Sequence, residues 1–296
     1  MLAPLKACGA KPYQSAGMER NPVDHRDARA PLLGGGKGRG PRAFGLRCAW
    51  GLATWATMTE REAELIAVTQ LSGSVKLLRF RICDGEPLAY VPGQWLNLRL
   101  PDRPAADKRA YSIACAPDVH QPGQFELAVT HVAGGVISPT LHTMRQGERV
   151  WMDGPYGFFT REAPALFEPA LFVGTGTGIA PLRAMLQSAF ADVQSARVPM
   201  TLLFGCRTQA DILFKDEIEA WAQAHDNFTL HVTLSKPDQT WAGFQGYVQH
   251  HVAHALAQQS ARHVYVCGLS AMVQAVRHEL KALGLGRGAV HTERYD

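Results

Sequence analysis

A glycine-rich junction in the middle of the chain constrains the fold more than any other stretch. Residues 171–182 read LFVGTGTGIAPL, so an apolar run is followed by alternating glycines and then by a helical pattern that reaches Phe190. This order predicts a buried strand that turns sharply into a helix. Pro181 fits the first turn of that helix, because no hydrogen-bond donor is lost there.

The same junction suits a bound phosphate. Glycines let the backbone approach an anion closely, and the free N–H groups at the helix start point toward it with the positive end of the helix dipole. The spacing differs from the usual dinucleotide fingerprint, so a tight turn without a ligand stays open as an alternative. The residues of this candidate phosphate site are Gly174, Thr175, Gly176, Thr177 and Gly178.

Length and charge limit the possible classes of protein. The chain has 296 residues, enough for two domains, and a formal net charge of +4. Residues 1–57 contain nine Lys or Arg and three acidic residues, which leaves the remainder at −2. The remainder is therefore not broadly basic, and we predict no nucleic-acid partner. No apolar run approaches about 18–20 residues, so we predict no membrane span.

Residues 1–57 are predicted to be a disordered extension, because they are rich in Gly, Pro and Arg and have no hydrophobic period. A transit peptide is an alternative that fits poorly, given three acidic residues and few hydroxyls. A regular pattern begins at Met58, which suggests that residue as the natural start. The six cysteines have no CxxC spacing, so we predict no metal site and a reducing, cytoplasmic compartment.

From residue 63 to residue 153 the chain reads as short strands separated by turn residues such as Asp84-Gly85 and Pro92-Gly93. Six strands at this spacing predict a closed antiparallel barrel, with one helix at Ser138–Met144. The predicted strands are Glu64–Leu71, Ser74–Ile82, Trp95–Leu100, Ala110–Ala114, Phe125–His131 and Arg149–Met152.

After residues 154–157 (GPYG), strands alternate with helices. This alternation predicts a doubly wound parallel sheet with helices on both faces, an α/β architecture. Ligands bind such sheets at the carboxyl ends of the strands, where the glycine junction, Arg207, Ser235-Lys236 and Cys267 fall. The predicted strands are Ala170–Val173, Met200–Phe204, Phe228–Leu234, His263–Cys267 and Ala289–His291, and the predicted helices are Pro181–Phe190, Phe214–Gln223, Gly246–Gln258 and Ser270–Leu283.

Two motifs in the predicted barrel suit a ligand that carries phosphates. In residues 109–112 (RAYS), Arg109 and Tyr111 share one face of a strand and Ser112 lies on the other. A guanidinium can bind a phosphate, a phenol ring can lie against a planar ligand, and a hydroxyl can bond a ring nitrogen. Residues 134–138 (GGVIS) precede a helix with Ser138 as its N-cap. Two anion sites imply a pyrophosphate, whereas an ordinary strand and an ordinary capped helix are the alternative.

In their order along the chain, these motifs resemble the ferredoxin–NADP reductase family. The resemblance rests on the RAYS strand, the Gly-x-x-Ser helix start, GPYG, the Gly-Thr-Gly-Thr-Gly-Ile-Ala-Pro-x-Arg junction, Cys-Gly-Leu and a terminal Glu-x-Tyr, and it covers about residues 63–296. It implies an FAD-binding β-barrel at residues 58–160 and an NAD(P)-binding α/β domain at residues 161–296, with the flavin held between them.

The resemblance also implies roles for residues of the barrel. Arg109 would hold the flavin pyrophosphate, Tyr111 would stack on the isoalloxazine ring, and Ser112 would bond its N5 atom. The residues that would take the phosphates from the other side are Gly135, Val136, Ile137 and Ser138.

Around the nicotinamide, the resemblance implies a Ser, a Cys, a Glu and an aromatic residue near the C-terminus. The matching positions are Ser112, Cys267, Glu293 and Tyr295. Tyr295 would cover the flavin and move aside to admit the nicotinamide. It is the penultimate residue, so the terminal carboxylate cannot lie where a final Tyr would place it.

Coenzyme choice depends on partners for a 2′-phosphate. Ser235 and Lys236 match the family's Ser-Arg pair for that phosphate, and Tyr247 falls at the spacing of the adenine-stacking residue of NADPH-specific members. Gln245 replaces a second Lys of those members, and Arg207 is shared with NADH-using relatives. We therefore expect NADPH, with NADH as the alternative.

The resulting hypothesis is an FAD-dependent oxidoreductase that passes electrons from NAD(P)H to a separate one-electron carrier, such as ferredoxin, flavodoxin or an oxygenase. Hydride transfer to flavin N5 is mainly a matter of positioning, because the cofactors carry the reaction. The absence of a Cys cluster in the sequence argues against a built-in iron–sulfur module. A reductase of free flavin or quinone and a non-catalytic nucleotide-binding subunit are the alternatives.

Overall fold

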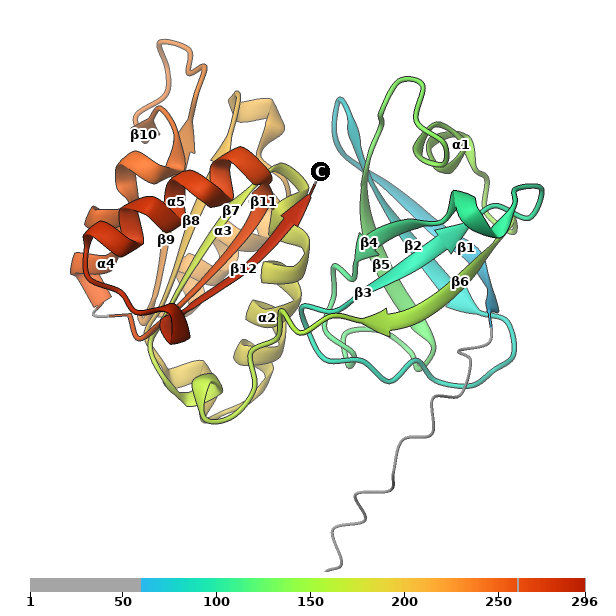
Figure 1. The fold of residues 1–296 in the computed structure, drawn as a ribbon, viewed down its shortest axis with the longest axis horizontal. Coiled ribbons are helices and arrows are strands. Elements are labelled where there is room, and N and C mark those ends of the chain that lie inside the picture. Colours follow the sequence, from blue (N-terminus) through green and yellow to red (C-terminus); the bar gives the residue numbers. More distant parts are fainter. Residues whose placement is uncertain (1–59, 260, 296) are drawn as a thin grey trace, which may run out of the picture. The chain divides into compact units, whose positions relative to one another are not determined.

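The computed structural model describes residues 60–259 and 261–295, which belong to one compact unit, Ala53–Asp296. Within this unit the chain forms a six-stranded antiparallel sheet followed by a six-stranded parallel sheet (Figure 1). This sequence of architectures confirms the predicted fold class, a β-barrel followed by a doubly wound α/β sheet. The predicted extension at residues 1–57 and the predicted start at Met58 lie outside the described residues.

The antiparallel sheet has the strand order β4-β3-β6-β1-β2-β5. An isolated antiparallel bridge from Ile113 to Leu127 joins the segment after β4 to β5, so the first and last strands of this order meet and the sheet closes. The helix predicted after β5 is present as α1. The elements are β1 (Arg61–Ser72), β2 (Val75–Ile82), β3 (Trp95–Arg99), β4 (Arg109–Ser112), β5 (Gln124–Thr130), α1 (Ser138–Thr143) and β6 (Arg149–Tyr156).

The barrel closes around an apolar interior, because alternate residues of its strands point inward. On β2, for example, Leu78, Phe80 and Ile82 are buried, and the ring of Phe80 stacks on that of Phe125 from β5 with centroids 5.6 Å apart. This interior forms an apolar cluster of its own within the barrel.

The parallel sheet has the strand order β10-β9-β8-β7-β11-β12. From β7 the chain runs outward to β8, β9 and β10 and then returns to place β11 on the other side of β7. The strand order therefore reverses between β7 and β11, which is where open α/β sheets bind ligands. The strands are β7 (Ala170–Thr175), β8 (Met200–Cys206), β9 (Phe228–Leu234), β10 (Phe244–Gln245), β11 (His263–Leu269) and β12 (Val290–Tyr295).

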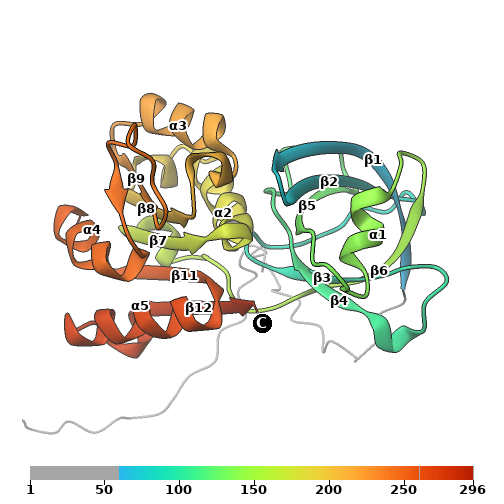
Figure 2. The same ribbon diagram turned by 90° about the horizontal axis from the view of Figure 1, so that it is seen from above.

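Helices cover both faces of this sheet, as Figure 2 shows for α2 and α3 on one side and α4 and α5 on the other. Along β7, Phe172 packs in the cluster beneath α2 and α3, whereas Leu171 and Val173 pack in the cluster beneath α4 and α5. The alternation explains why β7 reads as a continuous apolar run. The helices are α2 (Ile179–Ala191), α3 (Lys215–Ala224), α4 (Val252–Gln259) and α5 (Ser270–Ala282).

The predicted helix Gly246–Gln258 is wrong in its first part. Phe244–Gln245 forms the short edge strand β10, Gly246 has a φ of +94°, a 3-10 turn spans Val248–His251, and α4 begins at Val252. The Gly246 amide donates to the Leu234 carbonyl at 2.8 Å, and the Thr233 hydroxyl donates to the Gly246 carbonyl at 2.9 Å. These bonds to the edge of the sheet hold the chain extended, so a helix cannot start there.

Within the described ranges, no helix combines the length and the apolar character needed to cross a bilayer.

Candidate active site

The glycine junction connects β7 to α2 through a short 3-10 turn, Gly176–Gly178. Gly176 has a φ of +53°, and a Cβ added there would meet nothing within 4 Å. A Cβ on Gly178 would instead lie 2.3 Å from the Cys267 carbonyl oxygen, because α2 begins directly against β11. The junction therefore has one glycine facing open space and one required by close packing.

The hydroxyl of Thr175 lies in the glycine junction, next to Gly268. The Thr175 hydroxyl is buried and has no hydrogen-bond partner within the part of the chain that the structure describes. A Cβ on Gly268, whose φ is +148°, would lie 2.6 Å from that oxygen. A buried hydroxyl without a partner next to Gly176, which faces open space, fits a ligand that brings its own polar groups, as a nucleotide phosphate would.

The last strand, β12, is longer than predicted and includes two of the predicted site residues, Glu293 and Tyr295. The predicted strand ends at His291, but β12 continues to Tyr295 because it pairs in parallel with β11, Cys267 opposite Glu293 and Leu269 opposite Tyr295. This pairing places Glu293 and Tyr295 at the carboxyl end of the sheet, on the strand next to Cys267.

Ser112 from the barrel meets these residues. Its hydroxyl donates to Glu293 Oε1 at 2.8 Å and accepts a hydrogen bond from the Tyr295 hydroxyl at 2.8 Å. Ser112 and Glu293 are separated by 181 positions in the sequence. The fold thus brings three of the four residues predicted around the nicotinamide into one hydrogen-bonded chain, with Cys267 on the adjacent strand.

Burial favours the uncharged form of each titratable side chain in this group. It raises the pKa of Glu293 above its usual value, and the hydrogen bond from Ser112 only partly offsets that effect. Burial also raises the pKa of the Cys267 thiol and that of the Tyr295 phenol well above their usual values. Cys267 is therefore a thiol rather than a nucleophilic thiolate near neutral pH.

The barrel side of the site carries an available cation. Arg109 is exposed, and its Nη1 donates only to the adjacent Lys108 carbonyl, at 2.8 Å, among the hydrogen bonds of the described residues. Lys108 itself forms an ion pair with the buried Asp153, which also accepts a hydrogen bond from the Tyr156 hydroxyl at 2.8 Å. This network anchors the start of β4 and leaves the Arg109 guanidinium available to an anion.

Tyr111 lies between the barrel interior and the surface. It packs against the apolar cluster of the barrel, and burial raises the pKa of its phenol to about 12. The ring is thus fixed and neutral, as a platform for a planar ligand requires.

The predicted cap of α1 is wrong. Ile137, not Ser138, occupies the N-cap position, and no side chain caps the helix. The Ser138 hydroxyl instead accepts a hydrogen bond from the Val132 amide at 3.2 Å and so closes the loop that precedes the helix. Ile137 is fully buried in the barrel core, so only its backbone is available to a ligand. Gly134 has a φ of +73° with open space around it.

The residues predicted to read a 2′-phosphate come together through the backbone. The Ser235 amide donates to the Cys206 carbonyl at 3.0 Å, and the Lys236 amide donates to the Arg207 carbonyl at 2.8 Å. Arg207 and Lys236 are exposed, and Tyr247 is 63% exposed. The structure therefore brings two cations and a hydroxyl to the carboxyl ends of β8 and β9.

Comparison with known proteins agrees with this geometry. Residues 62–160 match the Oxidoreductase FAD-binding domain family, and residues 172–278 match the Oxidoreductase NAD-binding domain family. Ferredoxin--NADP reductase B of Sorangium cellulosum is 43% identical over 242 residues, which cover 79% of this chain and 97% of that reductase. The chain belongs to the ferredoxin–NADP reductase family. It is an oxidoreductase flavoenzyme that binds FAD and a pyridine nucleotide.

Other known proteins are similar to most of this chain. The toluate 1,2-dioxygenase electron transfer component of Pseudomonas putida is 29% identical over 79% of this chain and 67% of its own length. The crystal structure of cytochrome P450 reductase GcoB from Amycolatopsis superposes with a TM-score of 0.70 at 25% identity, over 80% of this chain and 70% of that one.

Sequence analysis quoted Arg183 only as the last residue of the glycine-junction motif and gave this buried arginine no role. Arg183 lies on α2, where every residue from Ile179 to Leu186 is buried, and it is only 7% exposed. Its guanidinium binds Glu126 of the barrel and Glu217 of α3. The available signal was a charged residue inside an otherwise apolar helical run, because such a residue needs a buried partner.

One cluster within the described ranges has spacing suited to a metal ion, although the sequence predicts none. Ligand atoms of Cys115, His120 and Glu126 lie within 4.8 Å of one another. The Glu126 carboxylate already binds Arg79 at 2.8 Å and Arg183 at 2.9 Å. His120 Nε2 lies 3.1 Å from the carboxylate but makes no hydrogen bond of good geometry. Two guanidiniums on one carboxylate oppose a bound cation, so this reductase offers no favourable metal site there.

Proposed function

We propose that this family member transfers electrons from NADPH through FAD to a separate one-electron carrier protein, a ferredoxin, a flavodoxin or an oxygenase component. The observation that carries the proposal is the bonded chain in which Ser112 of the FAD-binding barrel meets Glu293 and Tyr295 of the NAD-binding sheet. The names of its relatives support a separate acceptor, since they include an electron transfer component and a monooxygenase reductase subunit.

When bound, FAD accepts a hydride and releases electrons singly. On the barrel, the exposed Arg109 guanidinium would bind the flavin pyrophosphate, and the fixed Tyr111 ring would lie against the isoalloxazine. The backbone of residues 135–138 would take the phosphates from the other side. The open glycine at 134 fits this group, as does the exposed Arg109 guanidinium, which among the described residues bonds only the Lys108 carbonyl.

Ser112, Glu293 and Tyr295 would act at the reacting end of the two cofactors. Because burial favours the protonated form of Glu293, this carboxyl group would hold a proton at the reacting end, and the Ser112 hydroxyl that donates to its Oε1 would orient it. Cys267 would supply a small, neutral surface for the nicotinamide. The Gly174–Gly178 junction and the Thr175 hydroxyl would bind the nucleotide phosphates.

Tyr295 would act as a gate, because its hydroxyl donates a hydrogen bond to the Ser112 hydroxyl and its side chain packs against the apolar cluster that contains Cys267. Tyr295→Ser is expected to tighten nicotinamide binding and to change the rate of hydride transfer, measured by titration and by stopped-flow absorbance. Unchanged values for both would remove the gate from the proposal.

For the coenzyme we propose NADPH over NADH, because Arg207, Ser235 and Lys236 lie together and both cations are exposed. Lys236→Gln should weaken NADPH binding about 10-fold, as expected for loss of one charge-assisted contact. NADH binding should be nearly unchanged and serves as the internal control. Equal effects on both coenzymes would contradict a 2′-phosphate role for Lys236.

The test of the function is anaerobic mixing of the FAD-loaded protein with NADPH, followed by addition of acceptors. The flavin absorbance at about 450 nm should decrease on reduction and recover when a ferredoxin or flavodoxin is added. Failure to bleach with either coenzyme would favour a non-catalytic nucleotide-binding subunit. Faster turnover with free FMN or a quinone than with any protein carrier would favour the free flavin or quinone reductase.

A further inference from the structure

Arg183 links the barrel to the parallel sheet through a small polar cluster. Its Nη1 donates to the Ala114 carbonyl at 2.6 Å and to Glu126 Oε2 at 2.9 Å, both in the barrel. Its Nε donates to Glu217 Oε2 at 2.5 Å, on α3. The guanidinium carbon also lies 4.4 Å from the ring centre of Phe214, which precedes α3. One side chain on α2 thus bonds the barrel and the neighbouring helix together.

Gln187, one turn later on α2, makes a second link. Its Oε1 accepts a hydrogen bond from the Ala116 amide at 2.9 Å, and its Nε2 donates to Glu217 Oε1 at 2.8 Å. Positions four apart share a face of a helix, so Arg183 and Gln187 together hold residues 114–116. We call Arg183, Gln187, Glu126 and Glu217 the Arg183 cluster.

The charges of the Arg183 cluster are matched when the neighbouring Arg79 is included. Glu126 is 1% exposed and also binds Arg79, whose Nη2 lies 2.8 Å from Oε1. Burial alone would raise the pKa of Glu126, but Arg183 and Arg79 hold it below its usual value. His120 also faces this carboxylate, and burial lowers its pKa, so the imidazole adds little charge near neutral pH. Two carboxylates therefore face two guanidiniums.

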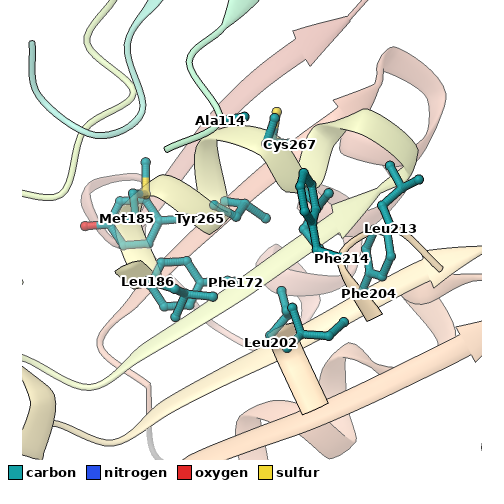
Figure 3. Packing of buried hydrophobic residues seen from close by; sticks show 14 of the residues in the cluster. Ala114, Phe172, Met185, Leu186, Leu202, Phe204, Leu213, Phe214, Tyr265 and Cys267 are labelled. Carbon is teal, nitrogen blue, oxygen red and sulfur yellow. The ribbon is translucent and has the colours of Figure 1, made fainter. Parts of the chain in front are cut away.

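The surroundings of the Arg183 cluster are apolar. Ala114 packs in the same cluster of buried side chains as Cys267 and Phe172, as Figure 3 shows. Apolar contacts are not directional and permit sliding, whereas a guanidinium bonded to three fixed acceptors sets one position. The polar bonds of Arg183 and Gln187 therefore define how residues 114–116 lie against α2.

Both ends of this link are close to the candidate active site. Residues 114–116 lie two to four positions after Ser112, and Arg183 lies five positions after Gly178 in the phosphate junction. Any shift of α2 against residues 114–116 would move Ser112 relative to Cys267 and Glu293. Hydride transfer depends steeply on such alignment, and a misplacement of about 1 Å can cost 100-fold in rate.

We propose that Arg183 is a positioning residue that aligns the flavin-bearing barrel with the nicotinamide-bearing sheet for hydride transfer. This inference rests on the proposed function. On this proposal, Arg183 affects the rate of hydride transfer at saturating coenzyme but not the affinity for FAD or for the nicotinamide.

The test compares Arg183→Gln and Arg183→Lys with the matched control Arg79→Gln, all as FAD-loaded full chains. Arg79 binds the same carboxylate from within the barrel and makes no bond to α2 that the structure shows. Arg183→Gln should lower the limiting rate of flavin reduction about 10- to 100-fold, with coenzyme Kd changed less than about 3-fold. The flavin–nicotinamide charge-transfer absorbance should fall with the rate, and Arg79→Gln should stay within about 2-fold.

A second readout needs no cofactor. Amide hydrogen exchange of residues 114–118 should speed up in Arg183→Gln but not in Arg79→Gln, since only the first change frees this segment from α2. If Arg183→Gln does not fold, Arg183→Lys and Gln187→Leu test the proposal in its place, because both keep Glu126 and Glu217. Each should lower the limiting rate by a smaller factor than Arg183→Gln.

Three results would overturn the proposal. They are a wild-type limiting rate in Arg183→Lys and Gln187→Leu, an equal loss in Arg79→Gln and Arg183→Gln, or a loss that appears wholly in coenzyme Kd. A wild-type protein that NADPH and NADH do not reduce would refute the proposed function instead, and the exchange measurement would still test the link to α2.

Discussion

The glycine junction of the parallel sheet and the phosphate-binding side of the barrel present their candidate binding groups in opposite ways. In the sheet the groups are built into the core: Gly178 packs against β11, Thr175 has a buried hydroxyl, and Cys267 is fully buried. In the barrel the corresponding groups lie outside: Arg109 is exposed and Gly134 faces open space. The difference teaches that changes at the buried glycine junction should affect folding and binding together, whereas a change at the exposed Arg109 should affect binding alone.

The largest expected effect is that of Gly178→Ala. Gly178 has a φ of −60°, which any residue adopts, so the only penalty is the Cβ placed 2.3 Å from the Cys267 carbonyl. Overpacking of this kind costs about 3 kcal/mol of the free energy of unfolding. Chemical denaturation and flavin content should both report the loss.

Gly176→Ala is the matched control for that prediction. Its Cβ would meet nothing within 4 Å, and the only penalty is the left-handed conformation at a φ of +53°, about 1 kcal/mol. A loss as large as that of Gly178→Ala would show that conformation, and not contact with β11, governs the junction.

A smaller effect, confined to binding, is expected for Arg109→Gln in the barrel. Loss of one charge-assisted contact to a phosphate should weaken FAD binding about 30-fold, or about 2 kcal/mol. Because Arg109 is exposed and bonds only the neighbouring Lys108 carbonyl in the described part of the chain, the unfolding free energy of the apoprotein should change by less than about 0.5 kcal/mol. Titration of the apoprotein with FAD measures the change in binding, and unfolding in denaturant measures the change in stability. A large loss of apoprotein stability would break the contrast between barrel and sheet.

The smallest effect is expected at Glu293, where the two regions meet. Burial raises its pKa above the usual 4.5, so the folded protein binds this proton more tightly than the unfolded chain. Stability therefore falls as pH rises from about 4.5 through the raised pKa. The proton-dependent rate should fall over the same window, and Glu293→Gln should abolish both slopes and lower the rate about 10-fold at acidic pH.

Stopped-flow reduction and thermal unfolding across pH provide the measurement for Glu293. Tyr295→Phe, which removes the hydroxyl bonded to Ser112 but keeps the carboxyl group, should retain the pH dependence. An unchanged profile in Glu293→Gln would assign the proton to another group.

Much of the fold was predictable because the relevant signals are local. The apolar run before Gly174 predicted a buried strand, and the change from short strands to alternating strands and helices after residue 157 predicted two architectures in the right order. The prediction failed where contacts across the fold override local pattern. Hydrogen bonds to β9 keep Gly246 out of the helix predicted to begin there, and Ser138 closes a loop instead of capping α1.

By itself the sequence determined the backbone of the glycine junction, the strand that carries Arg109 and Tyr111, and the family to which these motifs point. Such features depend on residues a few positions apart, whose sterics and periodicity decide the local conformation. Only the tertiary structure decided that Ser112 bonds Glu293 across 181 positions and that Arg183 binds Glu126 across 57. These pairings arise from how a barrel packs against a helix, and no local pattern encodes which distant partner satisfies a buried charge.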